Sequence, residues 1–98
     1  MPTSDSYLDA LIESLKNPER AAGYLSAALE AEDFEPEIIR AAIADVINAR
    51  CRMNNLSDSA KLHHEKLDKI LLEQGCCEIY SFVELLDRLG FRLEVTVK

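Results

Sequence analysis

The sequence predicts a mainly α-helical fold of about six helices, closed by one C-terminal β-strand. Apolar residues recur with a helical period along most of the chain, proline and glycine divide it into short segments, and the last eight residues change to the two-residue period of a strand. A chain of 98 residues is long enough to form one hydrophobic core but too short to form two independent ones. We therefore expect a single domain over 1–98, with an N-terminal helical segment (1–35), a helical core region (36–90) and a C-terminal strand (91–98).

Two helices are expected in the N-terminal segment. Thr3 or Ser4 can cap the first helix, and Asn17-Pro18 ends it. Asn17 then caps a second helix that begins at Pro18, because the first helical position needs no backbone N–H donor. A loop follows over 30–35. The side chains expected to be buried are Leu8, Leu11, Ile12, Leu15, Ala21, Ala22, Leu25, Ala28 and Leu29.

A third, strongly amphipathic helix is expected to begin at Pro36. Its apolar residues recur at i, i+1, i+4, i+5, i+8 and i+9, which places them on one face. They are Ile38, Ile39, Ala42, Ile43, Val46 and Ile47.

The next stretch, NNLSDSAKLHHEKLDKILL, is interpreted as two helices joined by a tight turn. Asn54 would cap a short fourth helix over 54–60, the turn would lie at 61–62, and a fifth helix over 63–73 would end at Gly75. Two short helices in this arrangement form a helix-turn-helix. On this interpretation the core-facing side chains are Leu62, Leu67, Ile70 and Leu71.

The end of the chain is expected to hold a sixth helix and a strand. The helix would end at Gly90, with Ile79, Phe82, Val83, Leu85, Leu86 and Leu89 turned inward. In FRLEVTVK, apolar and polar residues alternate, which indicates a strand. Because a single strand leaves its backbone groups unpaired, we expect it to pair with the same strand of a second copy in a homodimer.

Charge is distributed unevenly along the chain. The net charge is −7, and residues 1–50 carry four basic side chains against ten acidic ones. Residues 50–70 carry five basic side chains against three acidic ones, a local charge of +2. Attraction to phosphate is screened over about 10 Å, so a locally basic segment can bind DNA despite an acidic remainder.

These segments together resemble the addiction-module antidote (antitoxin) proteins of bacteria, which carry a Cro/repressor-type helix-turn-helix. LIESLKNPERAAGYLSAALEAED is similar to the family's N-terminal segment, and PEIIRAAIADVINAR to its next helix. Three positions depart from the family pattern: Lys61 replaces a glycine in the turn, His63 replaces a capping Ser or Thr, and Cys76-Cys77 replaces Asn-Pro. The matched framework residues are Met53, Leu56, Ser57, Leu62, Glu65, Leu67, Lys69, Leu71, Gly75, Phe82, Leu85, Leu86, Leu89, Gly90 and Leu93.

The resemblance implies a dimeric repressor that binds operator DNA, including its own promoter region, and a cognate toxin as a further partner. In such motifs the N-terminal residues of the second helix meet base edges, while nearby basic residues meet phosphates. The candidate DNA-binding residues are Arg52, Asn54, Lys61, His63, His64, Lys66 and Lys69.

Simpler interpretations of these residues remain open. The helix face could be ordinary solvated surface with a Glu65–Lys69 pair, and Arg52 could neutralise the negative end of the third helix. The two histidines could make DNA affinity depend on pH, or could be exposed side chains without such a role. The alternative function is a protein-interaction module, or a toxin-neutralising antitoxin whose helix-turn-helix no longer binds DNA, because the acidic half suits a basic protein partner.

Other classes are not expected. The three glycines are isolated and no catalytic signature surrounds a nucleophile, so we expect neither an enzyme nor a cofactor. The cysteines at 51, 76 and 77 are expected to be free thiols, because their number is odd and two are adjacent. With no leader-like N-terminus and no long apolar run, a cytoplasmic protein without a membrane span is expected.

Overall fold

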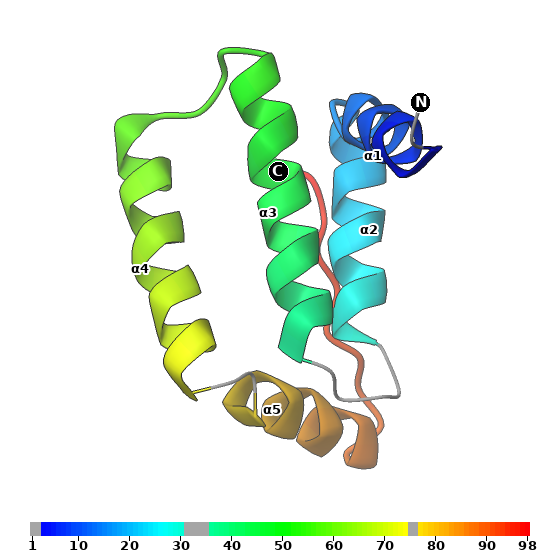
Figure 1. Cartoon of the computed structure of the whole chain (residues 1–98). Coiled ribbons are helices and arrows are strands. Elements are labelled where there is room, and N and C mark those ends of the chain that lie inside the picture. The colour runs from blue at the N-terminus through cyan, green and yellow to red at the C-terminus, as the bar shows by residue number, and fades with distance from the viewer. Residues whose placement is uncertain (1–2, 31–35, 75–76) are drawn as a thin grey trace.

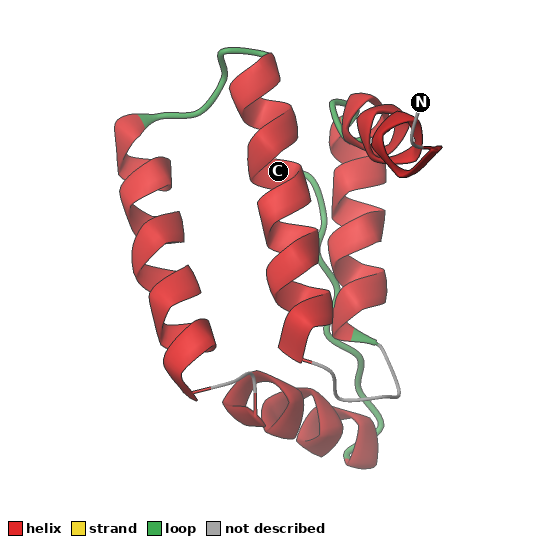
Figure 2. Ribbon diagram, in the orientation of Figure 1, coloured by secondary structure: helices red, strands yellow, loops and turns green. Residues whose placement is uncertain are grey.

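The computed structural model describes residues 3–30, 36–74 and 77–98 and is mainly α-helical, as predicted. The described ranges contain five helices and no strand (Figure 2), so the expected six helices and C-terminal strand are wrong. None of these helices combines the length and the apolar composition that crossing a membrane requires. The helices are α1 (Thr3–Ser14), α2 (Pro18–Leu29), α3 (Pro36–Arg52), α4 (Asp58–Gln74) and α5 (Cys77–Arg88).

The helices α2 and α3 lie side by side and run in opposite directions (Figure 1). Helix α1 packs across one end of this pair, near the C-terminus of α3, and α5 lies across the other end. Helix α4 returns along α3 in the opposite direction. The expectations for the loop at 31–35 and for Gly75 and Cys76 fall outside the described residues.

The boundary between α1 and α2 is the one that the sequence predicts. Oδ1 of Asn17 accepts hydrogen bonds from the backbone N–H groups of Glu19 (2.9 Å) and Arg20 (3.3 Å), and Pro18 is the first helical residue. These bonds satisfy N–H groups that have no partner within the helix. The cap therefore fixes where α2 begins.

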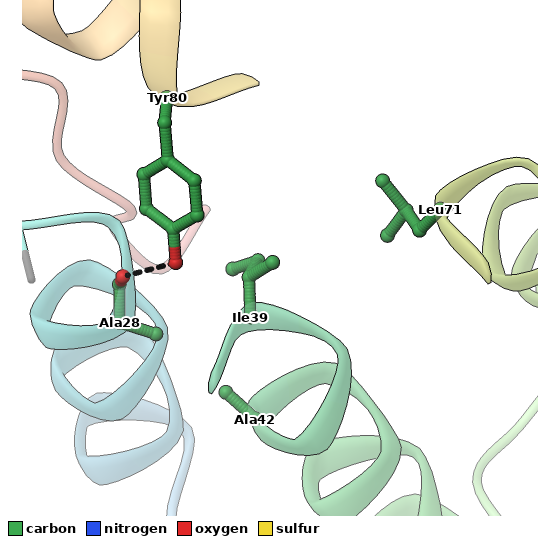
Figure 3. Packing of buried hydrophobic residues seen from close by; sticks show 5 residues of the cluster. All are labelled: Ala28, Ile39, Ala42, Leu71 and Tyr80. Carbon is green, nitrogen blue, oxygen red and sulfur yellow. Dashed lines mark hydrogen bonds between the residues drawn. The ribbon is translucent and has the colours of Figure 1, made fainter. Parts of the chain in front are cut away.

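Two clusters of buried side chains form the core. One comprises Ile12 and Leu15 of α1 with Ala49 of α3. The other joins four helices and comprises Ala28, Ile39, Ala42, Leu71 and Tyr80. In Figure 3 the ring of Tyr80 points from α5 toward α2, where its hydroxyl donates a 3.4 Å hydrogen bond to the carbonyl of Ala28.

Asn54 ends α3 and does not cap the following helix. Its φ is +52°, in the left-handed region that asparagine tolerates better than most residues. The N–H of Asn54 donates to the carbonyl of Cys51 (3.1 Å) and that of Asn55 to the carbonyl of Arg50 (2.9 Å). This pair of bonds is the Schellman arrangement, which satisfies the last carbonyls of a helix. The predicted role of Asn54 as an N-cap is therefore wrong.

Helix α4 runs without a break through the predicted turn at 61–62. Ser57 caps it, since its Oγ accepts a hydrogen bond from the N–H of Ala60 at 3.1 Å. Lysine and leucine are good helix formers, and a left-handed turn at Lys61 would be strained, so nothing local interrupts the helix. The structure thus replaces the predicted fourth and fifth helices by one, and α3 and α4 form an antiparallel hairpin (Figure 1) instead of a helix-turn-helix.

Helix α5 ends at Arg88, and Gly90, two residues later, terminates it, as predicted. Gly90 has φ +88°, and the N–H of the next residue, Phe91, donates to the carbonyl of Leu86 at 2.7 Å. A positive φ at this position costs glycine no steric strain. The chain then turns back toward α2.

The C-terminal tail, residues 91–98, is extended but joins no sheet. It runs along α2 and α3 (Figure 1), with Leu93 and Val95 half-buried. The N–H of Val95 donates to Oγ of Ser26 at 2.8 Å, and this hydroxyl lies 3.2 Å from the Val95 carbonyl, to which it donates. A helix side chain thus satisfies backbone groups for which the sequence interpretation invoked a second strand.

Candidate interaction surface

An ion pair between Arg40 of α3 and Asp68 of α4 joins the two helices. Nε and Nη2 of Arg40 lie 3.1 and 3.3 Å from the two carboxylate oxygens of Asp68, a two-point contact. The hydrogen bond from Arg40 lowers the pKa of the Asp68 carboxyl below its usual value of 3.8. Leu71 is the one described side chain of α4 that is fully buried. Helix α4 is therefore held on one face only.

His64 lies on this inner face of α4. The residue is half-buried, and its Nε2 is fully buried without a hydrogen-bond partner among the described residues. With Glu37, Arg40 and Asp68 it lines an open pocket of about 310 Å³ between α3 and α4. His64 therefore faces α3, whereas the sequence interpretation placed it toward solvent or DNA.

The other polar candidates on α4 are exposed. They are Lys61, His63, Lys66 and Lys69. Lys66 and Lys69 are three residues apart, so they share the side of α4 that faces away from Leu71. Neither makes an ion pair with a described residue. The helix as a whole is not basic, because three lysines stand against four carboxylates, a net charge of −1.

Arg52 is joined to α1 instead of facing outward as a free cation. Its Nη1 lies 2.7 Å from Oδ1 of Asp9 and 3.0 Å from Oε2 of Glu13. Glu13 also binds Lys16 at 2.9 Å, and hydrogen bonds from Lys16 and Arg52 lower the pKa of its carboxyl. Two carboxylates thus compete with any phosphate for Arg52. The structure brings Lys61, His63, Lys66 and Lys69 onto one helix but leaves Arg52 and Asn54 in helix-end roles.

Several large apolar side chains of α4 and α5, and of the residue that follows α5, are exposed. Half of the residues expected to be buried in α5 are exposed: Phe82 by 52%, Leu85 by 54% and Leu89 by 60%. On α4 the exposed apolar residues are Leu62, Leu67, Ile70 and Leu72, although three of these were expected in the core. The predicted burial of these side chains is wrong because no described segment covers them.

Two exposed apolar residues of α5 and Leu89, which directly follows the helix, form one continuous row. Phe82, Leu85 and Leu89 have the spacing i, i+3 and i+7, which aligns them along one side of the helix. We call these three residues the α5 row. A different side of α5 is attached to the core through Tyr80, with Ile79 packed against the same cluster.

The sequence contained a signal for this row that the interpretation missed. The apolar residues of α5 form one arc that is wider than the stripe a surface helix needs to face a core, so part of the arc lies beyond the core contact. Assigning the whole arc to one core overlooked its outer part.

Cys51, in the last turn of α3, is an exposed free thiol, as expected.

Comparisons of the chain with protein-family models, with curated proteins and with solved structures found no match. The resemblance to the antidote family therefore rests on the sequence pattern alone.

Proposed function

We propose that the chain is a protein-interaction module whose docking surface is formed by the exposed apolar side chains of α4 and α5. The observation that carries the proposal is the α5 row, in which three large apolar side chains in line are each more than half exposed. Single exposed apolar residues are ordinary on a protein surface, whereas a contiguous row marks a contact surface. A toxin of the kind that antidote proteins neutralise is one partner that the family resemblance suggests.

The shape of the hairpin supports this role. Helix α4 is attached on one face by Leu71 and by the Arg40–Asp68 pair, so its other faces are open to a partner. The apolar side chains at 62, 67, 70 and 72 surround much of the helix, which is typical of a helix buried on several sides. A partner would supply the missing cover.

Photo-crosslinking in cells tests the proposal. Replacing Phe82 with p-benzoylphenylalanine keeps an aromatic side chain in the α5 row, and the same replacement at the exposed Asn48 of α3 is the control. We expect a discrete protein adduct from position 82 and none from position 48. The absence of any protein adduct from position 82 would refute the proposed function.

DNA binding is the second candidate, and it is favoured by Lys66 and Lys69, which are exposed and form no ion pair with a described residue. It would operate without the predicted helix-turn-helix, with α4 approaching phosphates along its outer side. If both lysines contact phosphate, replacing both with alanine should reduce the slope of log K against log salt by about two units in anisotropy measurements with upstream DNA. An unchanged slope excludes these contacts.

A further inference from the structure

The C-terminal tail lies in a groove between α2 and α3 (Figure 1). Leu93 and Val95 are half-buried, whereas Glu94 and Thr96 are exposed. Alternate side chains of an extended chain point to opposite sides, so one side of the tail faces the helices. We call the surface that receives this side the α2/α3 groove. The helix residues that line it beside the end of the tail are Pro18, Ala21, Ala22, Leu25, Val46 and Arg50.

One hydroxyl group holds the tail by its backbone. Oγ of Ser26 accepts a hydrogen bond from the N–H of Val95 at 2.8 Å and donates one to the carbonyl of the same residue at 3.2 Å. Because both bonds go to backbone groups, any extended segment can form them, whatever its side chain at that position. Peptide recognition of this kind takes affinity from main-chain bonds and selectivity from alternate side chains. The groove therefore suits extended segments in general and not only the tail.

The other attachments of the tail are weak. No residue of the tail is among the fully buried side chains of the described chain. The ion pair between Arg92 and Glu30, at 3.3 Å, joins side chains that are 70% and 45% exposed. Exposed ion pairs contribute little to stability. A competing segment can therefore displace the tail without disturbing the core.

The tail also fills the groove incompletely. A space of about 320 Å³ lies between residues 95–98 and the two helices. Val97 is the apolar residue that follows Val95 in the alternation, but it is 51% exposed and so fills this space only in part. A segment that packs more closely at this end would make contacts that the tail does not make.

Arg50 adds a positive charge at the unfilled end of the groove. The residue is half-buried and forms no ion pair with a described residue. The tail brings a second cation, Lys98, to the same space. A carboxylate in place of Lys98 would attract Arg50, whereas the lysine repels it. The charge at this end therefore favours an acidic segment over the tail.

We propose that the α2/α3 groove binds an extended segment of a partner protein, with apolar side chains at alternate positions and an acidic residue beside Arg50. The C-terminal tail is the internal occupant that this segment displaces. A tail on a short connection competes at an effective concentration of about 1 mM, so it sets the threshold for binding. The groove lies on other elements than the α5 row, and the proposal stands whether or not a partner docks on α4 and α5.

Two synthetic peptides with blocked ends test the groove. The tail peptide has the sequence of residues 91–98, and the acidic peptide is the same with Lys98→Glu, so the two differ only at the position beside Arg50. Each is titrated into the isotope-labelled full chain, and binding is measured from the amide chemical shifts of α2 and α3. The acidic peptide should bind about threefold more tightly than the tail peptide, and Arg50→Gln in the chain should remove that difference.

Weakening the tail should strengthen peptide binding. Leu93→Gln combined with Val95→Gln places two polar side chains against the helices and so releases the tail. The acidic peptide should then bind about tenfold more tightly, or more, than it binds the unaltered chain. Glu94→Gln with Thr96→Gln puts the same residue at two exposed positions and is the matched control, which should bind as the unaltered chain does. Ser26→Ala in the released chain should weaken binding about fivefold.

Hydrogen exchange at the Val95 amide of the unaltered chain gives a second measurement that needs no variant. Exchange should become faster as the acidic peptide is added, because peptide and tail compete for Ser26. Unchanged exchange with the peptide bound would place the peptide elsewhere and overturn the proposal. A released chain that keeps the amide shifts of folded α2 and α3 but binds neither peptide would overturn it too. Equal affinity of the two peptides for the chain with Arg50 would reject the acidic partner.

Discussion

The hydroxyl of Tyr24 in α2 donates a 2.8 Å hydrogen bond to Oδ2 of Asp45 in α3. Burial of the phenol, and then this bond to a carboxylate, raise the pKa of Tyr24 from its ordinary value of 10.0 to about 12. The bond is therefore a titratable link between the two central helices.

The first prediction concerns alkaline pH. Since the pKa of Tyr24 is higher in the folded than in the unfolded chain, its stabilising contribution is complete below pH 10 and is lost as pH rises through 12. Subtracting the ultraviolet titration of Tyr24→Phe from that of wild type should give a phenol with a midpoint near 12. A difference curve centred at 10 would contradict the buried hydrogen bond.

The second prediction tests whether α4 is continuous. Lys61→Gly should lower the free energy of unfolding by about 1 kcal/mol, because glycine is unfavourable inside a helix. Lys66→Gly, at another exposed position in α4, should cost a similar amount and serves as the control. If the chain formed the helix-turn-helix instead, glycine at 61 would relieve strain and only the change at 66 would destabilise. Urea denaturation measures both.

The third prediction concerns the Arg40–Asp68 pair in acid. Because the folded pKa of Asp68 is lowered from 3.8, its contribution is present above that pH and is lost as pH falls through the lower folded value. Asp68→Asn should therefore lower the stability at pH 6, and its stability should fall less than that of wild type on acidification below pH 4. Glu65→Gln, an exposed neighbour on α4, is the control and should follow the wild-type acid profile more closely.

The fourth prediction concerns the C-terminal tail. Ser26→Ala removes both hydrogen bonds to Val95 and should cost about 1 kcal/mol. Hydrogen exchange at the Val95 amide should become faster, with little change in the interior of α3. Ser81→Ala, at an exposed serine of α5, should leave the Val95 amide as protected as in wild type. Unchanged exchange at Val95 in the Ser26 variant would mean that the tail is held by other contacts.

The sequence predicted those boundaries that one residue type determines. Asn17-Pro18 and Gly90 each allow one local structure that satisfies the helix ends, and both are used as expected. The start of α3 was predicted for a related reason, since a proline begins the helix and its apolar face is unambiguous.

The helix boundary in the stretch from Asn54 to Ala60 was harder to predict, because two residues there could act as the N-cap of the next helix. Asparagine is suited both to an N-cap and to the left-handed residue after a helix, and here it takes the second role while Ser57 takes the first. Because Ser57 and not Asn54 is the N-cap, α4 begins later in the sequence than predicted, and no turn at Lys61 is needed. The tail was mispredicted for a different reason. Its two-residue period shows that one of its faces is apolar, but the surface of a helix can cover that face just as a neighbouring strand would.

The candidate site could be predicted only in part. The exposure of Lys66 and Lys69 follows from helical spacing, whereas the pairing of Arg52 with Asp9 and Glu13 depends on where α1 crosses α3. At that crossing Arg52 contacts two residues that lie 43 and 39 positions earlier in the chain. No local sequence pattern encodes such a tertiary contact.

Tyr24 also has a consequence for how the chain opens. Among the described side chains it is the one that packs against both buried clusters, so it couples α1, α2 and α3 into one cooperative unit. Helices α4 and α5 contribute only Leu71 and Tyr80 to the fully buried set. We therefore expect α4 and α5 to detach before the three-helix body unfolds, which would let these two helices rearrange around a partner without global unfolding.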